Sequence, residues 1–212
     1  MKTDFVKSKI TGGHYGFVAP RSGKVFVNKM TECMLIQLRP DDVVADIGAY
    51  VGEYSMYAVS QGVKRVMSYE ASPVTFEVLK KNKRDGMDIH NLAVVGNDEP
   101  TVELFISTGI GASNSIAKTK GTSIIVPAIK YEDAVKDATV AKIDVEGAEY
   151  GYNIIQPQLR AITLEFHPIV NVDWKSNAEK IMSDLEASGY KCLKRPKFSH
   201  GWDMHGTWSK DD

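Results

Sequence analysis

The stretch VAKIDVEGAEY, residues 140–150, places the carboxylates Asp144 and Glu146 directly after an apolar run. The run has the length and composition of a buried strand. A second such run, RAITLEF, contains Glu165 near its end and is followed by His167. Carboxylates and a histidine gathered in one cleft are the groups that carry out general acid–base chemistry. Asp144, Glu146, Glu165 and His167 are therefore the candidate catalytic residues.

An earlier apolar run, DVVADIG, ends in Asp46 and Gly48, and Ala49 and Gly52 follow in the predicted turn. Glycine lets the backbone approach a ligand closely. The turn lacks the third glycine of the dinucleotide fingerprint, and it has an acid before the first glycine. A carboxylate is a poor neighbour for pyrophosphate but a suitable one for a cation. The turn thus favours S-adenosylmethionine, which carries an ammonium and a sulfonium.

The next predicted strand, KRVMSYE, ends in Glu70. A carboxylate about 20 residues beyond the glycine turn is where a ribose diol is bound in nucleotide-binding folds. On the third predicted strand, the small side chain of Ala93 would leave room for an adenine ring. The candidate cofactor-binding residues are Asp46, Gly48, Ala49, Gly52, Glu70, Ala71 and Ala93.

These residues must be positioned by elements that alternate along the chain. Strand, helix, strand, helix and strand are expected over residues 42–48, 53–62, 64–70, 72–86 and 88–96. Ser72 is placed to cap the second helix, and Pro73 suits its first position. This order predicts an α/β fold with a doubly wound, mostly parallel sheet. Residues 30–38 also have helical spacing.

The second half of the chain breaks the alternation. Two strands, residues 101–107 and 122–130, have no long helix between them, so we expect a hairpin-like insertion with residues 109–121 as a mobile lid. Further strands are expected at 139–145 and 160–166, then a helix at 177–189 and two strands that include an antiparallel pair. In the usual right-handed winding the first, fourth and fifth core strands are neighbours, which would bring the candidate catalytic residues beside the glycine turn.

Several of these stretches together resemble the FkbM-type family of S-adenosylmethionine-dependent methyltransferases. They are VVADIGAYVGEYSMYAV, YEASPVTFEVLKKN, NLAVVGND and, most specifically, KIDVEGAE. AIKYEDAVKD is similar too, with Tyr131 where a leucine is more usual. The resemblance runs from about Val43 to Phe166 and implies the seven-stranded class I fold. It also implies O-methylation of a small molecule, sugar or natural product.

The flanks of the chain match no motif of that family and are expected to shape the acceptor site. We expect one methyltransferase domain over residues 1–212, with residues 1–40 as a substrate or lid extension and residues 41–212 as the class I core. Two widely separated cysteines, no signal-peptide core and no apolar run of about 20 residues favour a cytoplasmic protein without a membrane partner. Oligomeric state stays open.

Other functions remain open at this point. A net charge of −1 disfavours a broad phosphate-binding face, but RNA ribose O-methylation is not excluded because Lys142 and Asp144 share a strand face. A nicotinamide-dependent oxidoreductase and a non-catalytic nucleotide-binding module are alternatives of other classes. The carboxylates could instead hold a divalent metal such as Mg²⁺, although no ligand spacing decides this.

Overall fold

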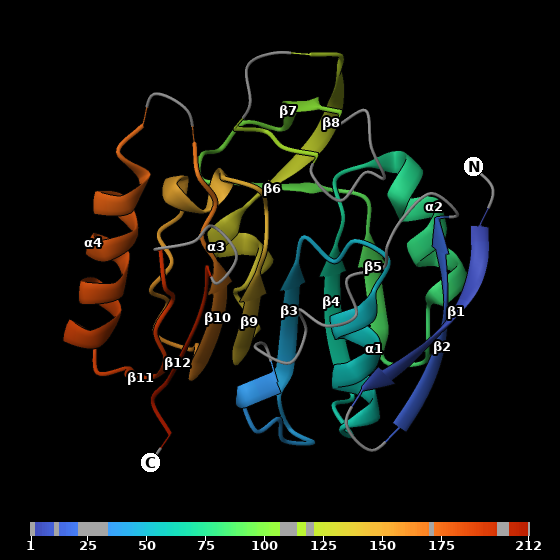
Figure 1. Cartoon of the computed structure of the whole chain (residues 1–212), viewed down its shortest axis with the longest axis horizontal. Coiled ribbons are helices and arrows are strands. Elements are labelled where there is room, and N and C mark those ends of the chain that lie inside the picture. The colour runs from blue at the N-terminus through green and yellow to red at the C-terminus, as the bar shows by residue number, and fades with distance from the viewer. Residues whose placement is uncertain are drawn as a thin grey trace.

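The computed structural model describes residues 3–10, 13–20, 34–106, 114–117, 121–169, 172–198 and 204–211. Its centre is a seven-stranded sheet in the order β11-β12-β10-β9-β3-β4-β5 (Figure 1). Neighbouring strands from β10 to β5 are parallel, and β12 runs antiparallel to both of its neighbours. The strands are β3 (Val43–Ile47), β4 (Arg65–Tyr69), β5 (Met87–His90), β9 (Val140–Ile143), β10 (Ala161–Glu165), β11 (Lys191–Lys194) and β12 (His205–Ser209). The predicted mostly parallel sheet is confirmed, including β3, β9 and β10 as neighbours.

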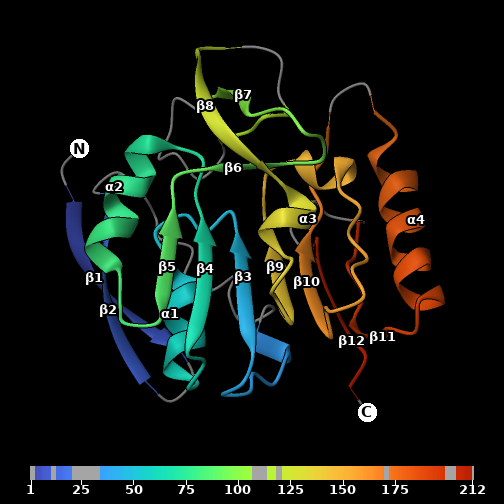
Figure 2. The ribbon, with the colours of Figure 1, turned by 180° about the vertical axis from the view of Figure 1, so that it is seen from behind.

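Helices cover both faces of this sheet (Figures 1 and 2). Side chains alternate along each strand, so Val44 and Val66 pack with the helices α1 (Glu53–Ser60) and α2 (Pro73–Asn82). Their neighbours along the strands, Ala45 and Met67, point to the other face, where α3 (Tyr131–Ala134) and α4 (Trp174–Ala187) lie. The sheet is therefore doubly wound, as the sequence predicts.

The local signals at the helix ends also hold. The Ser72 hydroxyl accepts a hydrogen bond from the Thr75 amide at 3.3 Å, and Pro73 occupies the first position of α2. Gly62, just after α1, has φ of 92°, a left-handed conformation that glycine adopts at little cost. In residues 34–40 the expected helix at 30–38 is not seen as an α-helix, but Ile36 is buried in the core beside α1. Residues 34–35 form a short 3-10 turn instead, and residues 30–33 lie outside the described residues.

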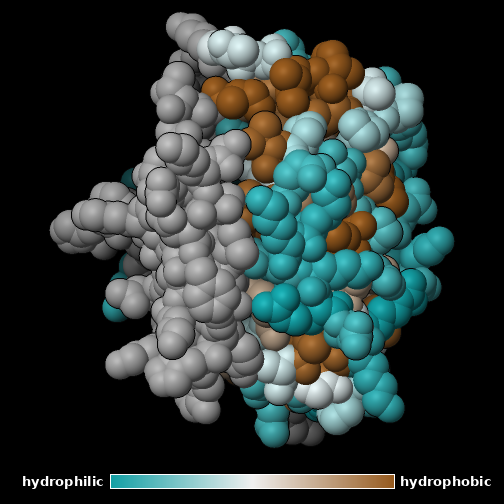
Figure 3. All heavy atoms as spheres, turned by 90° about the vertical axis from the view of Figure 1, so that its right-hand side faces the viewer, coloured by the Kyte–Doolittle hydropathy of each residue, from teal (hydrophilic) through white to brown (hydrophobic). Residues whose placement is uncertain are grey.

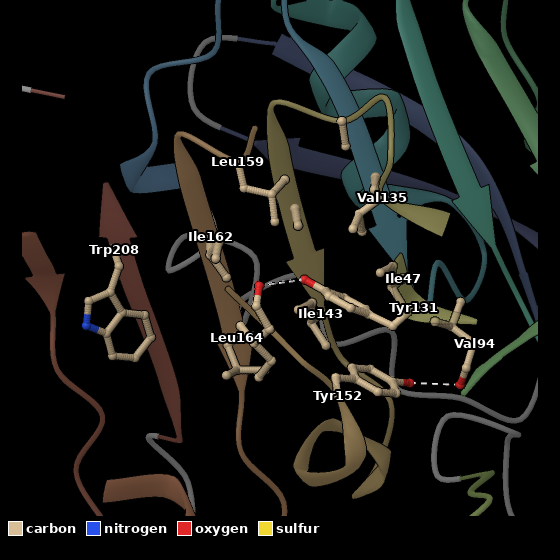
Figure 4. Close-up of a cluster of buried hydrophobic side chains, with 14 of the residues drawn as sticks. Ile47, Val94, Tyr131, Val135, Ile143, Tyr152, Leu159, Ile162, Leu164 and Trp208 are labelled. Atoms are coloured by element: carbon tan, nitrogen blue, oxygen red, sulfur yellow. Dashed lines mark hydrogen bonds between the residues drawn. The ribbon is translucent and has the colours of Figure 1, made fainter. Parts of the chain in front are cut away.

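Two tyrosines anchor the core on the α3 face (Figure 4). The rings of Tyr131 and Tyr152 stack with centroids 4.9 Å apart. Their hydroxyls donate to the carbonyls of Ile154, at 3.1 Å, and Val94, at 2.8 Å. Because each buried hydroxyl has a partner, the rings can fill the core without leaving a polar group unsatisfied.

A second, three-stranded sheet lies above the carboxyl ends of the large one. Its order is β6-β8-β7, with β6 (Ala93–Val95), β7 (Thr101–Phe105) and β8 (Ser123–Lys130). The predicted hairpin is present as the antiparallel pair β7–β8. The prediction of one strand over residues 88–96 is wrong. The chain leaves the large sheet after His90 and enters a different sheet as β6. Between the two strands, the side-chain amide of Asn91 donates to the carbonyls of Glu70 and Ala71.

Two features of the surface complete the fold. The strands β1 (Thr3–Ile10) and β2 (Gly13–Pro20) form a separate antiparallel hairpin, and β2 lies alongside α2 (Figure 1). Seen from the α2 side, hydrophobic side chains gather in a band at the top of the molecule, with mostly hydrophilic ones below (Figure 3). Among the described residues, no helix has both the length and the apolar character needed to span a membrane.

Candidate active site

The turn between β3 and α1 is pressed against the end of β9. Gly48 has φ of 77°, and a Cβ there would lie 1.8 Å from the carbonyl oxygen of Asp144. The amides of Gly48 and Ala49 both donate to the Tyr69 carbonyl, at 3.0 and 2.9 Å. Gly52, also with positive φ, faces a side chain of α2 so closely that a Cβ would be 2.6 Å from Leu79 Cδ1. The predicted glycine turn is thus a close backbone approach between strand ends.

Glu70 is held at the end of β4 by two backbone amides. Its Oε2 accepts from the Tyr50 amide at 3.0 Å and its Oε1 from the Ser72 amide at 2.9 Å. Burial raises the pKa of Glu70 to about 7, with these hydrogen bonds opposing the rise. Each carboxylate oxygen keeps a further lone pair, so the group can still accept from a diol.

The small residues of the predicted adenine side lie together. Ala93, which is buried, forms a small apolar cluster with Leu104 of β7 and Val126 of β8, and Ala71 packs against this cluster. Ala93 comes from β6 rather than from the large sheet, so the cluster depends on the three-stranded sheet.

Asp46 is fully buried and already has partners. Its Oδ2 accepts from the Ser55 hydroxyl at 2.6 Å, and its Oδ1 lies 3.3 Å from the Lys142 Nζ. Lys142 also donates to the Gly48 carbonyl at 2.6 Å. The cation beside Asp46 in this structure is therefore the chain's own lysine, which ties the glycine turn to β9.

A different carboxylate near this turn has an atom without a hydrogen bond. Glu53, at the first position of α1, has a buried Oε1 that accepts no hydrogen bond within the described parts of the chain. Burial raises the pKa of Glu53 to about 7, while the Lys142 ammonium acts in the opposite direction. In sequence, Glu53 looks like an ordinary acid of a first helical turn, so no local pattern marks it as a binding residue.

The four candidate catalytic residues do converge. The Nε2 of His167 lies 3.6 Å from Asp144 Oδ1, 3.8 Å from Glu146 Oε1 and 3.8 Å from Glu165 Oε1. Their side chains are graded in exposure, from 33% for Asp144 and 25% for Glu146 to 10% for His167 and 7% for Glu165. Asp144 and Glu146 are thus the more exposed pair, and His167 and Glu165 are more deeply buried. We call these four residues the acidic wall.

Glu149, the third acid of the opening stretch, has a different position. It is fully buried, and its carboxylate accepts from the backbone amides of Gly147, at 2.8 Å, and His167, at 2.7 Å. The same carboxylate lies 3.4 Å from His167 Nδ1. Glu149 therefore joins the loop after β9 to the end of β10 and faces one side of the imidazole.

His205 joins the wall although sequence analysis did not include it. β12 pairs with β10 in a register that puts His205 opposite Glu165, and His205 Nε2 lies 3.0 Å from Glu165 Oε2. Both residues are buried. Only the antiparallel register brings them together, and no local pattern near His205 indicates it.

The charges in the wall influence one another. Burial lowers the pKa of His167, but the carboxylates of Glu149, Asp144 and Glu165 outweigh it and raise that pKa to about 9. Burial raises the pKa of the Asp144 carboxyl, Lys142 opposes that rise, and Glu165 adds to it. The wall therefore holds a cation among several carboxylates.

The predicted lid at 109–121 lies largely outside the described residues, which here include 114–117 and 121. Within them, the Ser115 hydroxyl donates to the Glu146 carbonyl at 2.6 Å and accepts from the Ala117 amide at 3.0 Å. This part of the insertion thus touches the backbone of the acidic wall.

Comparison with known proteins identifies a family for this chain. The sequence model of the family described as Methyltransferase FkbM domain matches residues 46–192, more than half of the chain. No curated protein sequence matches the chain significantly.

Solved structures share the fold. A SAM-dependent methyltransferase from Agrobacterium tumefaciens is similar with a TM-score of 0.53 and 11% identity, over 98% of this chain and 71% of that one. Precorrin-6y C5,15-methyltransferase from Geobacter metallireducens GS-15 is similar with a TM-score of 0.51 and 16% identity, over 91% of this chain and 92% of that one. At such low identity the likeness is one of fold alone, and that fold is the class I methyltransferase fold.

Proposed function

The chain belongs to the FkbM methyltransferase domain family, and we propose that it transfers the methyl group of S-adenosylmethionine to a hydroxyl oxygen of a small molecule or sugar. The observation that carries the proposal is the contact between Gly48 and the Asp144 carbonyl. This contact puts the acidic wall next to the glycine turn, where a class I methyltransferase binds its cofactor.

The cofactor would lie along the carboxyl ends of β3 and β4 and the start of β6 at Ala93. The remaining lone pairs of Glu70 suit the ribose diol, and the cluster of Ala71 and Ala93 suits the adenine. Glu53 Oε1, which accepts no hydrogen bond from the described residues, suits the ammonium at the methionine end of the cofactor. Asp46 would act through Lys142 and Ser55 by fixing the turn. The residues present therefore fit S-adenosylmethionine.

The reaction would be an in-line displacement at the methyl carbon. The acceptor oxygen forms a bond to carbon while the carbon–sulfur bond breaks, and S-adenosylhomocysteine leaves as a neutral thioether. The hydroxyl proton must go to a base, and Asp144 is our first choice because its carboxylate is the most exposed of the acidic wall. Glu165, paired with His205, would orient groups behind it.

We propose roles for two segments outside the parallel core. Residues 109–121 are proposed as a lid, supported by the Ser115 contact with the wall. Residues 1–40 are proposed as an extension of the class I core at 41–212. Their described hairpin lies beside α2, on the cofactor half of the sheet.

Methyl-labelled S-adenosylmethionine with a panel of sugars, phenols and polyols tests the proposal directly. We expect label in an ether that survives mild base, with one S-adenosylhomocysteine formed per methyl transferred. Parallel arms contain RNA, or contain NADH observed by its fluorescence. Label in RNA alone would favour ribose methylation, and NADH binding without S-adenosylhomocysteine binding would contradict the proposal.

Cofactor affinity should depend on pH near neutrality. Burial raises the pKa of Glu70 to about 7, and only the ionised carboxylate can accept from both ribose hydroxyls. As pH falls from 8 to 6, the ionised fraction of Glu70 falls, so this carboxylate alone should raise the dissociation constant of S-adenosylhomocysteine by up to about tenfold. Calorimetry at several pH values measures this.

The matched control removes the two groups that titrate in this range. Glu53 also has a pKa of about 7, so the double variant Glu53→Gln, Glu70→Gln should bind more weakly but with an affinity that hardly changes from pH 6 to 8. A pH dependence as steep as that of the unmodified protein would exclude these carboxylates as its source.

A further inference from the structure

His167 has the orientation of a metal ligand rather than of a base held by a hydrogen bond. Its imidazole is nine-tenths buried, and Glu149 lies 3.4 Å from Nδ1 on one side. On the other side, Nε2 faces the oxygens of three carboxylates at 3.6–3.8 Å, too far for a hydrogen bond. A carboxylate behind one ring nitrogen commonly orients a histidine whose other nitrogen binds a metal.

The carboxylates in front of Nε2 provide the other ligands. One oxygen each from Asp144 and Glu146 and a nitrogen of His167 all lie within 4.8 Å of one another. Ligands bound to one cation at about 2.1 Å lie roughly 3.0–3.5 Å apart, depending on the geometry. The observed spacing is slightly wider, so a cation between the three groups would need only small side-chain shifts.

A second triad shares one residue with the first. Asp144 also lies close to Glu165 and His205 in the same manner. That triad is more deeply buried, and Glu165 and His205 are already in contact at 3.0 Å. The triad of Asp144, Glu146 and His167 is therefore the better candidate, because its two carboxylates are partly exposed and leave room for an exogenous ligand.

We propose that Asp144, Glu146 and His167 bind one divalent transition-metal ion, with Glu149 orienting the imidazole. Two carboxylates with one imidazole suit Mn²⁺, Fe²⁺ or Zn²⁺ better than Mg²⁺, which is usually bound by oxygen atoms alone. Three protein ligands leave coordination positions open. An acceptor hydroxyl bound there would be acidified, so the inference deepens the proposed function and rests on it for this last step.

The binding step can be tested without any methyl acceptor. The chain is stripped with EDTA, dialysed and titrated with Mn²⁺, and the free ion is followed by electron paramagnetic resonance. We expect one Mn²⁺ per chain. Glu146→Gln, at a partly exposed position, should weaken binding by at least about tenfold, and Asp144→Asn and His167→Ala should do the same.

The control is Asp98→Asn, an exposed acid that pairs with Lys130 and belongs to neither triad, and it should bind Mn²⁺ unchanged. Thermal unfolding checks that each variant is folded. No Mn²⁺ binding, or equal binding by Glu146→Gln, overturns the metal site.

Calorimetry with S-adenosylhomocysteine on the same samples separates the two proposals. Cofactor binding without Mn²⁺ binding would remove the metal site and leave the methyltransferase proposal standing. Mn²⁺ binding without cofactor binding would support the metal site and contradict the methyltransferase proposal.

Discussion

Replacing Asp144 by asparagine should lower turnover by about 10²–10⁴-fold while cofactor affinity changes little. The side chain keeps its shape but loses the charge that could take a proton or bind a cation. Because the Asp144 side chain is one-third exposed, the fold should tolerate the change. Glu70→Ala should have the reverse signature, with weaker binding of S-adenosylhomocysteine and turnover that recovers at saturating cofactor.

The asymmetry follows from the charge on the cofactor. The sulfonium loses its positive charge as the methyl group moves, so carboxylates that merely attract it would stabilise the ground state more than the transition state. Asp144 must therefore contribute through the acceptor, as a base, by orienting the hydroxyl or by holding a metal. The two variants separate acceptor chemistry from cofactor binding.

Steady-state rates with saturating acceptor, and calorimetry with S-adenosylhomocysteine, measure the two effects. Asp98→Asn serves as the control, since it removes an exposed acid elsewhere on the surface. Adding EDTA distinguishes a metal-dependent role from a metal-free one. If each of the single variants Asp144→Asn, Glu165→Gln and His167→Ala kept full turnover, the acidic wall would have only a structural role.

Local sequence is sufficient to predict where most strands end. The apolar runs at residues 42–48 and 139–145 predict β3 and β9, which end at Ile47 and Ile143, and the usual right-handed winding predicts that they are neighbours. This is why Asp46, Glu70 and Asp144 are found at strand ends, as expected. Local pattern and overall fold agree here, which is typical of sequences that specify one structure.

The partners of those residues could not be predicted in the same way. Lys142 lies beside Asp46 because β3 and β9 pair in a register that sets these residues opposite each other, across 96 positions of sequence. His205 reaches Glu165 only through the antiparallel pairing of β12 with β10. A register between distant strands depends on the packing of the whole sheet, so no window of sequence contains it.

The position of Glu146 depends on a turn that the sequence pattern does not predict. A strand is expected over residues 139–145, but β9 ends at Ile143. Glu146 has φ of 56°, a left-handed conformation that is uncommon for a residue other than glycine. That turn, followed by Gly147, directs the Glu146 carboxylate toward His167.

The second large effect is expected at Gly48, where we predict that Gly48→Ala destabilises the fold and abolishes cofactor binding. An alanine in the left-handed conformation costs about 1–2 kcal/mol. The new methyl group would also overlap the Asp144 carbonyl, because a Cβ there lies 1.8 Å from that oxygen. Overpacking typically costs about 1–3 kcal/mol, so the free energy of unfolding should fall by about 2–5 kcal/mol.

Gly189→Ala separates the two contributions. Gly189 has φ of 86°, close to the 77° of Gly48, but a Cβ there would have no atom within 4 Å. Only the conformational cost of about 1–2 kcal/mol should remain, and S-adenosylhomocysteine should bind normally. Urea unfolding and calorimetry on both variants measure the difference.

If the two substitutions cost the same and Gly48→Ala still bound the cofactor, the contact between the glycine turn and the acidic wall would have no role in either stability or binding. The larger loss at Gly48 would instead show that the distance between cofactor and acceptor is set by this backbone contact, since relieving the overlap requires the ends of β3 and β9 to move apart.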